Sequence, residues 1–230
     1  MGSEPPGEQS RPGATSAPVR RVRPEDVGAL SACLARAFAD DPVSCYLFPT
    51  PRSHLRRLER YFRWQFEHVF LRRGEGWTTD DLAGASLWIP PVQRPPSAAE
   101  GLLQLATVVP ILGRHTGRAL QLLDVLERVH PKVEHCYLGT IGTDPDRQGR
   151  GIGSLLMRVV LDRLDSAGTP AYLESSKEEN LPFYGRVGFE VIGEVGGPGS
   201  GIPRIWLMWR EPKPADDGSS TTRAAHPSAG

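Results

Sequence analysis

The sequence DPDRQGRGIG, residues 144–153, lies between a predicted strand at 136–143 and a predicted helix at about 151–167. The helix is well marked because apolar residues recur at helical spacing, at Ile152, Leu155, Leu156, Val159, Val160 and Leu164. The first turn of a helix has backbone N–H groups without partners and carries the positive end of the helix dipole. A glycine-rich turn at this position therefore predicts a binding site for an anion such as a phosphate.

The side chains of this turn also suit an anion. Arg147 and Arg150 add positive charge, and no carboxylate occupies the first turn of the helix. The glycines let the backbone approach a ligand closely. The predicted anion-binding residues are Arg147, Gln148, Gly149, Arg150, Gly151, Ile152, Gly153 and Ser154. A glycine-rich turn without a ligand is the structural alternative, and the turn alone does not exclude it.

Two other nucleotide-binding motifs do not fit. A P-loop ends in Gly-Lys-Ser/Thr, whereas these glycines lead into Ser154-Leu155. A dinucleotide-binding fingerprint that starts at Gly149 needs glycine at position 154, where this chain has serine. That fingerprint also normally lies in the first strand–helix unit of its domain, and this turn comes after residue 140. Neither of these nucleotide-binding folds is therefore predicted.

The turn and the segments that follow it resemble one protein family. Gln148, Gly151 and Gly153 match the pattern Q/R-x-x-G-x-G/A. They are followed, in order, by a predicted strand at 171–175, then Asn180, Phe183-Tyr184 and Gly188-Phe189. This arrangement resembles the GNAT superfamily of N-acetyltransferases, in which the glycine turn binds a pyrophosphate. Within that superfamily, the stretches 37–40, 138–145 and 173–184 are most similar to puromycin N-acetyltransferase-like proteins.

The resemblance implies an α/β protein with the GNAT acyl-CoA N-acyltransferase fold, a central twisted, mostly antiparallel mixed sheet flanked by helices. The predicted elements agree: a strand, two helices, three strands, the helix after the turn, and a strand–helix–strand–strand end. One domain is expected at 18–211, with a helical insertion at 98–130. Residues 1–17 and 212–230 are rich in Gly, Pro and Ser without an apolar period, which predicts disordered tails.

The family also implies acetyl-CoA as the cosubstrate. The backbone of Ile141, Gly142 and Thr143 is expected to pair with the pantetheine arm like an added strand. Asn180 and Phe183 are expected to contact the cosubstrate, although Asn180 could instead cap the helix at 181–187. No metal is expected, because the six histidines show no metal-ligand spacing and the three cysteines form no CxxC pair.

Acetyl transfer by direct attack in a ternary complex needs a base for the amine, stabilisation of the oxyanion and an acid for the departing thiolate. The resemblance places Tyr184 near the sulfur, and a phenol with a pKa near ~10 is still protonated at neutral pH, so Tyr184 is the predicted acid. Glu174, on the strand next to the cosubstrate strand, is the predicted base. The structural alternatives are a core aromatic at position 184 and a solvent-facing glutamate at position 174.

The candidate acceptor site begins where the first helix ends. Asp40 and Asp41 lie there and could hold a cationic amine. The alternative is a turn before Pro42 that only stops the helix. Tyr46 and Trp88 are further candidates for lining the acceptor pocket, although a tryptophan in an apolar strand is more often a core residue.

Composition limits the partners. The formal net charge is zero, so no overall field attracts nucleic acid or an anionic membrane. The longest apolar stretch, 102–112, is too short to span a bilayer. The absence of a secretion signal and the odd cysteine count predict a cytoplasmic protein. The expected oligomeric state is a monomer or a homodimer. The predicted function is acetyl transfer to a small-molecule amine. The alternatives are acetylation of a protein N-terminus or lysine, and a non-catalytic acyl-CoA-binding sensor.

Overall fold

The fold is described by a computed structural model that places residues 18–91 and 98–213. The tails predicted at 1–17 and 212–230 lie outside the described residues, apart from residues 212 and 213. The predicted domain at 18–211 corresponds to the part that the structure describes, with a gap at 92–97.

The centre of the protein is a mixed sheet of seven strands in the order β1-β2-β3-β4-β5-β7-β6. The strands are β1 Val19–Arg21, β2 Glu75–Thr79, β3 Gly84–Ile89, β4 Cys136–Thr143, β5 Ala171–Ser175, β6 Glu190–Val195 and β7 Ile205–Arg210. Only the β4–β5 pair is parallel, and every other neighbouring pair is antiparallel. The predicted class, a mostly antiparallel mixed sheet flanked by helices, is confirmed.

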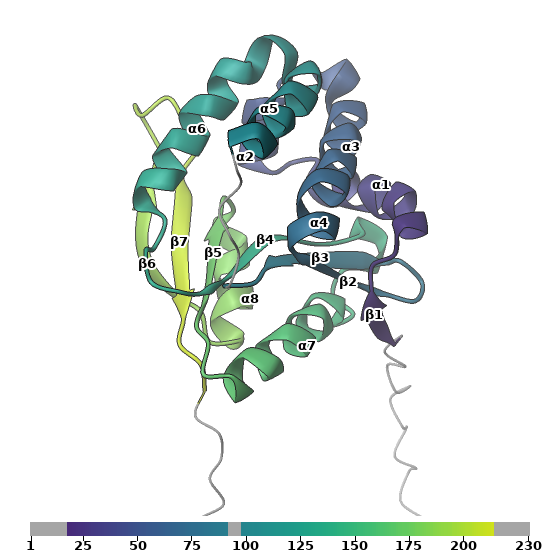
Figure 1. The fold of residues 1–230 in the computed structure, drawn as a ribbon, viewed down its shortest axis with the longest axis vertical. Coiled ribbons are helices and arrows are strands. Elements are labelled where there is room, and N and C mark those ends of the chain that lie inside the picture. The colour runs from purple at the N-terminus through teal and green to yellow at the C-terminus, as the bar shows by residue number, and fades with distance from the viewer. Residues whose placement is uncertain (1–17, 92–97, 214–230) are drawn as a thin grey trace, which may run out of the picture.

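Eight α-helices of the described residues cover the sheet. They are α1 Val27–Ala37, α2 Pro42–Leu47, α3 His54–Gln65, α4 Leu71–Arg73, α5 Ala98–Leu112, α6 Thr116–Val129, α7 Ile152–Ser166 and α8 Leu181–Arg186. A π-helical turn at Phe66–Phe70 joins α3 to α4. The helices α7 and α8 lie on one side of the sheet, and α1, α3 and α4 lie on the other (Figure 1). None of the described helices is long and apolar enough to cross a membrane.

Each face of the sheet carries its own hydrophobic core. Neighbouring residues of a strand point to opposite faces. Tyr172 accordingly belongs to the core under α1 and α3, and Leu173 to the core under α7. The α7 core includes Val160 and Leu164 of the predicted apolar face, together with Met157 and Leu161, which the prediction did not include. This packing fixes where α7 begins, and so it positions the glycine-rich turn at the edge of the sheet.

The predicted helical insertion forms α5 and α6, with a 3-10 turn at Gly113–His115 between them. Helix α5 packs against α3, and α6 packs against α2. The helix α2 was not predicted from the sequence. Asp41 begins it, because the Asp41 carboxylate accepts a 2.8 Å hydrogen bond from the backbone N–H of Ser44, while Pro42 takes the first helical position. The insertion therefore extends the layer of helices over the segment that follows α1.

The strands β4 and β5 separate after three paired residues. Their parallel pairing ends at Leu138 and Leu173, and the backbone of 139–143 has no strand partner on the β5 side. A bulge in β4 accompanies this separation, because Leu87 pairs with Thr140 and Trp88 pairs with Leu138, which leaves Gly139 as an extra residue. A Cβ at Gly139 would lie 2.8 Å from Cζ of Phe70, so the bulge requires glycine. The separation opens the middle of the sheet next to α8.

A buried ion pair ties the end of α7 to β7. The side chain of Arg210 is only 2% exposed, and its Nη1 and Nη2 each donate a 2.7 Å hydrogen bond to Asp165. The Arg210 hydrogen bonds hold the pKa of Asp165 below its ordinary value of 3.8. The pair therefore stabilises the fold above the carboxyl pKa of the unfolded chain. That contribution is lost as the pH falls through the folded-state pKa.

We expect Asp165→Asn to lower the free energy of unfolding at pH 7 by about 3 kcal/mol, because it leaves a buried guanidinium without its charge partner. Urea unfolding followed by circular dichroism measures this loss. The difference between wild type and variant should shrink below about pH 4. Asp162→Asn is the matched control, since Asp162 is exposed on the same helix. An equal loss of stability in both variants would contradict the assignment.

Candidate active site

The glycine-rich turn presents an open concave backbone at the start of α7. Gly149 and Gly151 have φ angles of +74° and +80°, which side-chain-bearing residues rarely adopt, and Gly151 is the N-cap residue of α7. A Cβ at either position would meet no atom within 4 Å, so the space beside the turn is free. No acidic residue lies in the first turn of α7. The turn therefore has the shape and the partial charge that a phosphate requires.

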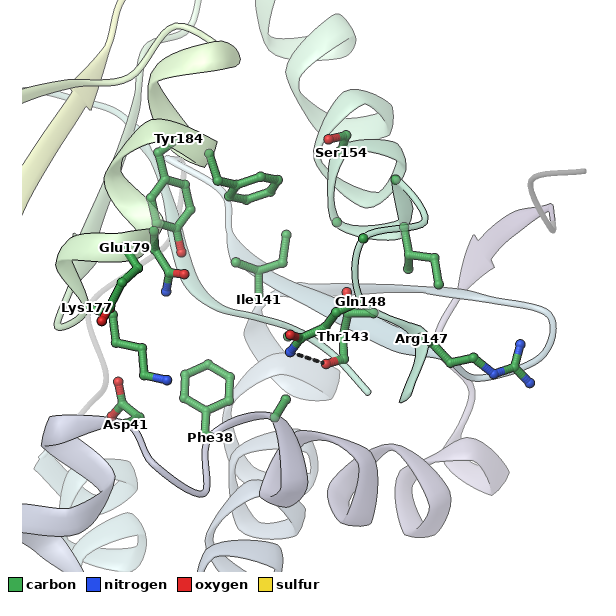
Figure 2. A pocket seen from close by; sticks show the side chains of 18 of the residues that line it. Phe38, Asp41, Ile141, Thr143, Arg147, Gln148, Ser154, Lys177, Glu179 and Tyr184 are labelled. Carbon is green, nitrogen blue, oxygen red and sulfur yellow. Dashed lines mark hydrogen bonds between the residues drawn. The ribbon is translucent and has the colours of Figure 1, made fainter. Parts of the chain in front are cut away.

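The charged side chains of the turn are directed elsewhere than predicted. Arg147 donates a 3.2 Å hydrogen bond to Asp81 in the β2–β3 turn, and Figure 2 shows its guanidinium pointing away from the cavity. Arg150 donates to the carbonyl of Asp146 at 3.3 Å and does not line the cavity. Gln148 donates to the carbonyl of Thr143 at 3.2 Å, which closes the turn (Figure 2). Arg150 therefore does not face the cavity and its predicted contact with an anion stays a prediction, while the groups of the turn that face the free space are mainly backbone.

A cavity of about 660 Å³ lies beside this turn. The turn contributes one wall, the end of α1 another, and the segment from Lys177 to Arg186 a third. The strand β4 contributes Ile141, Gly142 and Thr143. The other predicted residues that line the cavity are Asp40, Asp41, Arg147, Gln148, Gly149, Gly151, Ile152, Gly153, Ser154, Asn180, Phe183 and Tyr184. The predicted cosubstrate residues are thus brought together from three separate segments, with the exception of Arg150.

A second cavity, of about 60 Å³, occupies the gap where β4 and β5 separate. Phe38, Asp41, Ile141, Asn180 and Tyr184 line both cavities. The smaller cavity is lined by Glu174 as well, and by no lysine, arginine or histidine of the described residues. The two cavities therefore share a wall at Tyr184. The smaller of them carries two carboxylates and no cationic side chain.

The ring of Tyr184 packs in the α7 core, and its hydroxyl faces the cavities. The ring centroid lies 5.1 Å from that of Phe183 and 6.2 Å from that of Phe189. Figure 2 shows the hydroxyl pointing into the cavity, toward the side where Phe38 and Asp41 lie. Burial, together with the Asp41 charge, raises the pKa of Tyr184 well above its ordinary value. The hydroxyl therefore keeps its proton at neutral pH and is available as a donor.

Glu174 is enclosed, and the solvent-facing alternative for it is wrong. Its side chain is 9% exposed. The hydroxyl of Tyr137 donates a 2.6 Å hydrogen bond to Oε2 of Glu174, and Oε1 lies 3.7 Å from Nδ1 of His130. Burial and the adjacent Glu174 carboxylate raise the pKa of Tyr137, so this tyrosine stays protonated and donates. Glu174 is thus held by one oxygen beside the smaller cavity.

The two aspartates after α1 differ in their roles. Asp41 begins α2, which the predicted helix-stopping turn did not include, and it also accepts a hydrogen bond from the hydroxyl of Ser176. Asp40 is 78% exposed and pairs with Lys177 at 2.6 Å. The Lys177 hydrogen bond lowers the pKa of Asp40. Of the two carboxylates, only Asp41 lines both cavities.

The structure corrects the two predicted aromatic acceptor residues. Trp88 is fully buried in the α7 core, where its Nε1 donates to Ser86 at 3.1 Å, so it does not line either cavity. Tyr46 lies on α2, with Arg118 of α6 5.2 Å from its ring centroid, and it lines neither cavity. Both residues are therefore structural, Trp88 in the core and Tyr46 in the α2–α6 contact.

Asn180 does not cap α8. It occupies the N-cap position, but its side chain makes no capping hydrogen bond, and the residue lines both cavities. Five residues that line the larger cavity were not predicted from the sequence: Ala37, Phe38, Lys177, Glu179 and Arg186. All five lie in or next to stretches that carry the family resemblance, and that position was the available signal. Among the described residues, no group of three or more His, Cys, Asp or Glu side chains is placed to hold a metal ion.

Comparison with known proteins identifies the class that this fold and site define. The model of the acetyltransferase (GNAT) family matches residues 106–189. A relative from Schizosaccharomyces pombe, named an uncharacterized N-acetyltransferase, is 30% identical over 185 residues, which cover 74% of this chain and 73% of the relative. The chain therefore belongs to the GNAT family of acetyltransferases and is an acyltransferase enzyme. Its narrower similarity to puromycin N-acetyltransferases stays a prediction.

Further relatives have different names. A mycothiol acetyltransferase from Mycobacteroides abscessus is 33% identical over 176 residues, 69% of this chain, which spans about half (51%) of that protein. A crystal structure from Corynebacterium glutamicum, described as histone acetyltransferase HPA2 and related acetyltransferase, has a TM-score of 0.66 at 25% identity. It covers 88% of this chain and 99% of its own. Arylalkylamine N-acetyltransferase 2 from Aedes aegypti shares the fold, with a TM-score of 0.56 at 12% identity over 86% of this chain and 100% of its own.

The position of Gly153 provides a test of whether acetyl-CoA binds in the larger cavity. A Cβ at Gly153 would lie 3.2 Å from Cζ of Phe183, at the wall of the larger cavity. We expect Gly153→Val to weaken acetyl-CoA binding at least tenfold, or about 1.4 kcal/mol, by filling this wall. Isothermal titration calorimetry measures the change. Gly185→Val is the control, because a Cβ there meets nothing within 4 Å and the residue does not line the cavity. Unchanged affinity in Gly153→Val would place the ligand elsewhere.

Proposed function

We propose that this enzyme transfers the acetyl group of acetyl-CoA to the primary amine of a small molecule, by direct attack in a ternary complex. The observation that carries the proposal is the junction of the two cavities at Tyr184. One cavity begins at the glycine-rich turn and the other holds two carboxylates. A donor in the first and an amine in the second would meet beside the Tyr184 hydroxyl.

The residues of the larger cavity fit acetyl-CoA. The free backbone around Gly149 and Gly151 suits a pyrophosphate. The edge of β4 at 141–143, which lacks a strand partner on the β5 side, suits the amide groups of the pantetheine arm. Acetyl-CoA would supply an activated acyl group as a thioester. Asn180 and Phe183 would contact its arm from the α8 side.

The side chains at the junction account for the proton movements of the reaction. Glu174 would accept the proton of the acceptor amine, and a β4 backbone N–H would polarise the thioester carbonyl. Tyr184 would donate its proton, or a hydrogen bond, to the departing sulfur. Its raised pKa keeps that proton in place until negative charge develops on the sulfur. Asp41 would favour the approach of a cationic amine, since it lines the same cavity.

The helical insertion favours a small acceptor over a protein chain. Helix α6 packs on α2, and Arg118 of α6 donates a 3.0 Å hydrogen bond to the carbonyl of Tyr46. Asp41, at the start of α2, lines both cavities. The insertion therefore covers α2, the helix that begins beside the smaller cavity. One relative is named a mycothiol acetyltransferase, and one solved structure is described as a histone acetyltransferase. Both kinds of acceptor therefore belong in the test.

The test is an acceptor screen that detects free CoA. The purified full chain is incubated with acetyl-CoA and a panel of small primary amines, together with lysine-containing and free-N-terminal peptides. We expect turnover with small amines and little with peptides. Preferential turnover of peptides would establish the protein-acetylating alternative, and acetyl-CoA binding without any turnover would establish the sensor alternative. Failure to bind acetyl-CoA would remove the proposal altogether.

A further inference from the structure

We propose that His130 carries the acceptor's proton from Glu174 to solvent, and that His135 sets the tautomer of His130 that makes this transfer possible. The inference rests on the proposed role of Glu174 as the base. His130 follows the last residue of α6, and His135 directly precedes β4. The two ring centroids lie 5.0 Å apart, and Nε2 of one ring lies 3.2 Å from Nε2 of the other. Neither histidine was assigned a function from the sequence.

The hydrogen bonds of His135 determine where its proton lies. Its Nδ1 is 2.7 Å from the carbonyl oxygen of Val133, which can only accept, so Nδ1 carries the proton. Burial lowers the pKa of His135 and keeps the ring neutral. Its Nε2 is therefore an unprotonated acceptor. Nε2 of His130 must then donate to it, which leaves Nδ1 of His130 without a proton when His130 is neutral.

This unprotonated Nδ1 of His130 faces Glu174, the proposed base. It lies 3.7 Å from Oε1 of Glu174, while Oε2 of Glu174 is already bonded to the hydroxyl of Tyr137. When Glu174 is ionised, the Nδ1 lone pair of His130 has no proton to accept from it. When Glu174 is protonated, the same lone pair can accept its proton. The arrangement thus suits the moment after Glu174 has taken up a proton. The resulting imidazolium is stabilised by the Glu174 carboxylate on one side and by His135 on the other.

The surroundings leave His130 as the route to water. The Glu174 side chain is 9% exposed, whereas that of His130 is 35% exposed. The other titratable side chains that face this pair are Tyr137 and Tyr172, and burial raises the pKa of each. Trp209 of β7 makes an edge contact with the His135 ring and does not titrate. Among the described residues, His130 is therefore the group that both faces Glu174 and reaches solvent.

The proton balance of the relay is simple. The amine loses one proton as its nitrogen bonds to the acetyl carbon, and that proton binds to the Glu174 carboxylate. The carbon–sulfur bond of the thioester breaks, and the departing sulfur takes the proton of the Tyr184 hydroxyl, which Tyr184 regains from water. It then moves from Glu174 to Nδ1 of His130, which becomes an imidazolium, and from there to water or buffer. Glu174 is ionised again and His130 is neutral again, so the pair is ready for the next turnover. His130 acts through Glu174 and is a positioning and proton-carrying residue that does not touch the substrate.

The first test compares His130→Gln with wild type. Glutamine preserves a hydrogen-bond donor but cannot carry a proton, so we expect kcat to fall on the order of tenfold with KM nearly unchanged, less than the loss of a direct base. Added imidazole should restore most of the rate of the variant and leave wild type unaffected. His115→Gln, in the turn between α5 and α6, is the matched histidine control and should match wild type. Wild-type kcat in His130→Gln would overturn the relay, as would a loss that imidazole does not rescue in a folded variant.

The second test needs no variant and therefore does not depend on the folding of a mutant. Long-range ¹H–¹⁵N spectra of the imidazole rings in the wild-type protein report which nitrogen carries each proton. We expect the Nδ1–H tautomer for His135 and the Nε2–H tautomer for His130 at a pH where both are neutral. A proton on Nδ1 of neutral His130 would overturn the relay. If wild type transfers acetyl groups and Glu174→Gln abolishes transfer while His130 fails these tests, only the relay is lost. If wild type transfers none, the proposed function itself is lost.

Discussion

Replacing Tyr184 with phenylalanine is expected to lower kcat by about 10²–10³-fold and to leave the affinity for acetyl-CoA within about twofold of wild type. The ring stays in place, because its contacts with Phe183 and Phe189 do not involve the hydroxyl. The hydroxyl that faces the cavity junction is lost, and with it the proposed donor to the departing sulfur. Steady-state kinetics and calorimetric titration measure the two quantities separately.

Two features make this variant informative. The Tyr184 hydroxyl is held protonated by burial and by the Asp41 charge, so the rate of wild type should not follow ionisation of this phenol near neutral pH. Tyr61→Phe is the matched control, because Tyr61 is a tyrosine of the opposite core, stacked on Trp64. The role of Tyr184 would be refuted by an unchanged kcat in Tyr184→Phe. It would also be refuted by an equal loss in Tyr61→Phe.

The strands around the site could be predicted from the sequence because turn residues bound them. The predicted strands at 136–143 and 171–175 have the same bounds in the structure. Each run contains β-branched or aromatic residues, and a turn residue lies beside it, Asp144 after the first and Pro170 before the second. The apolar period of α7 was equally visible, because five of its residues are buried in the core. Local pattern therefore determines the elements that line the larger cavity.

The features that were missed depend on contacts between distant segments. Helix α2 has six residues, too few for a helical period, and its start depends on the Asp41 side chain. The direction of Arg147 depends on Asp81, 66 residues earlier in the chain. Trp88 is in the core because β3 lies in the middle of the sheet, under α7. None of these pairings leaves a local signal in a single sequence, so the sequence did not show α2, the direction of Arg147 or which of the two interpretations of Trp88 holds.

The environment of Glu174 shows the same limit and gives the second large prediction. Sequence alone left a catalytic base and a solvent-facing glutamate as equal alternatives. The structure encloses the side chain beside the smaller cavity, with one oxygen bonded to Tyr137. A carboxylate held in this way has a fixed direction and keeps its other oxygen for a proton.

We expect Glu174→Gln to lower kcat by about 10²–10³-fold, because the amide has nearly the same shape but cannot accept the proton of the amine. The acidic limb of the pH–rate profile should flatten in the variant, since the group whose ionisation it reports is gone. Glu190→Gln, on the exposed start of β6, removes the same charge away from the cavities and is the matched control. If Glu174→Gln keeps both the rate and the acidic limb, the base is a bound water or another group. In that case Glu174 serves only to hold the Tyr137 hydroxyl through its Oε2 atom, which links β5 to β4.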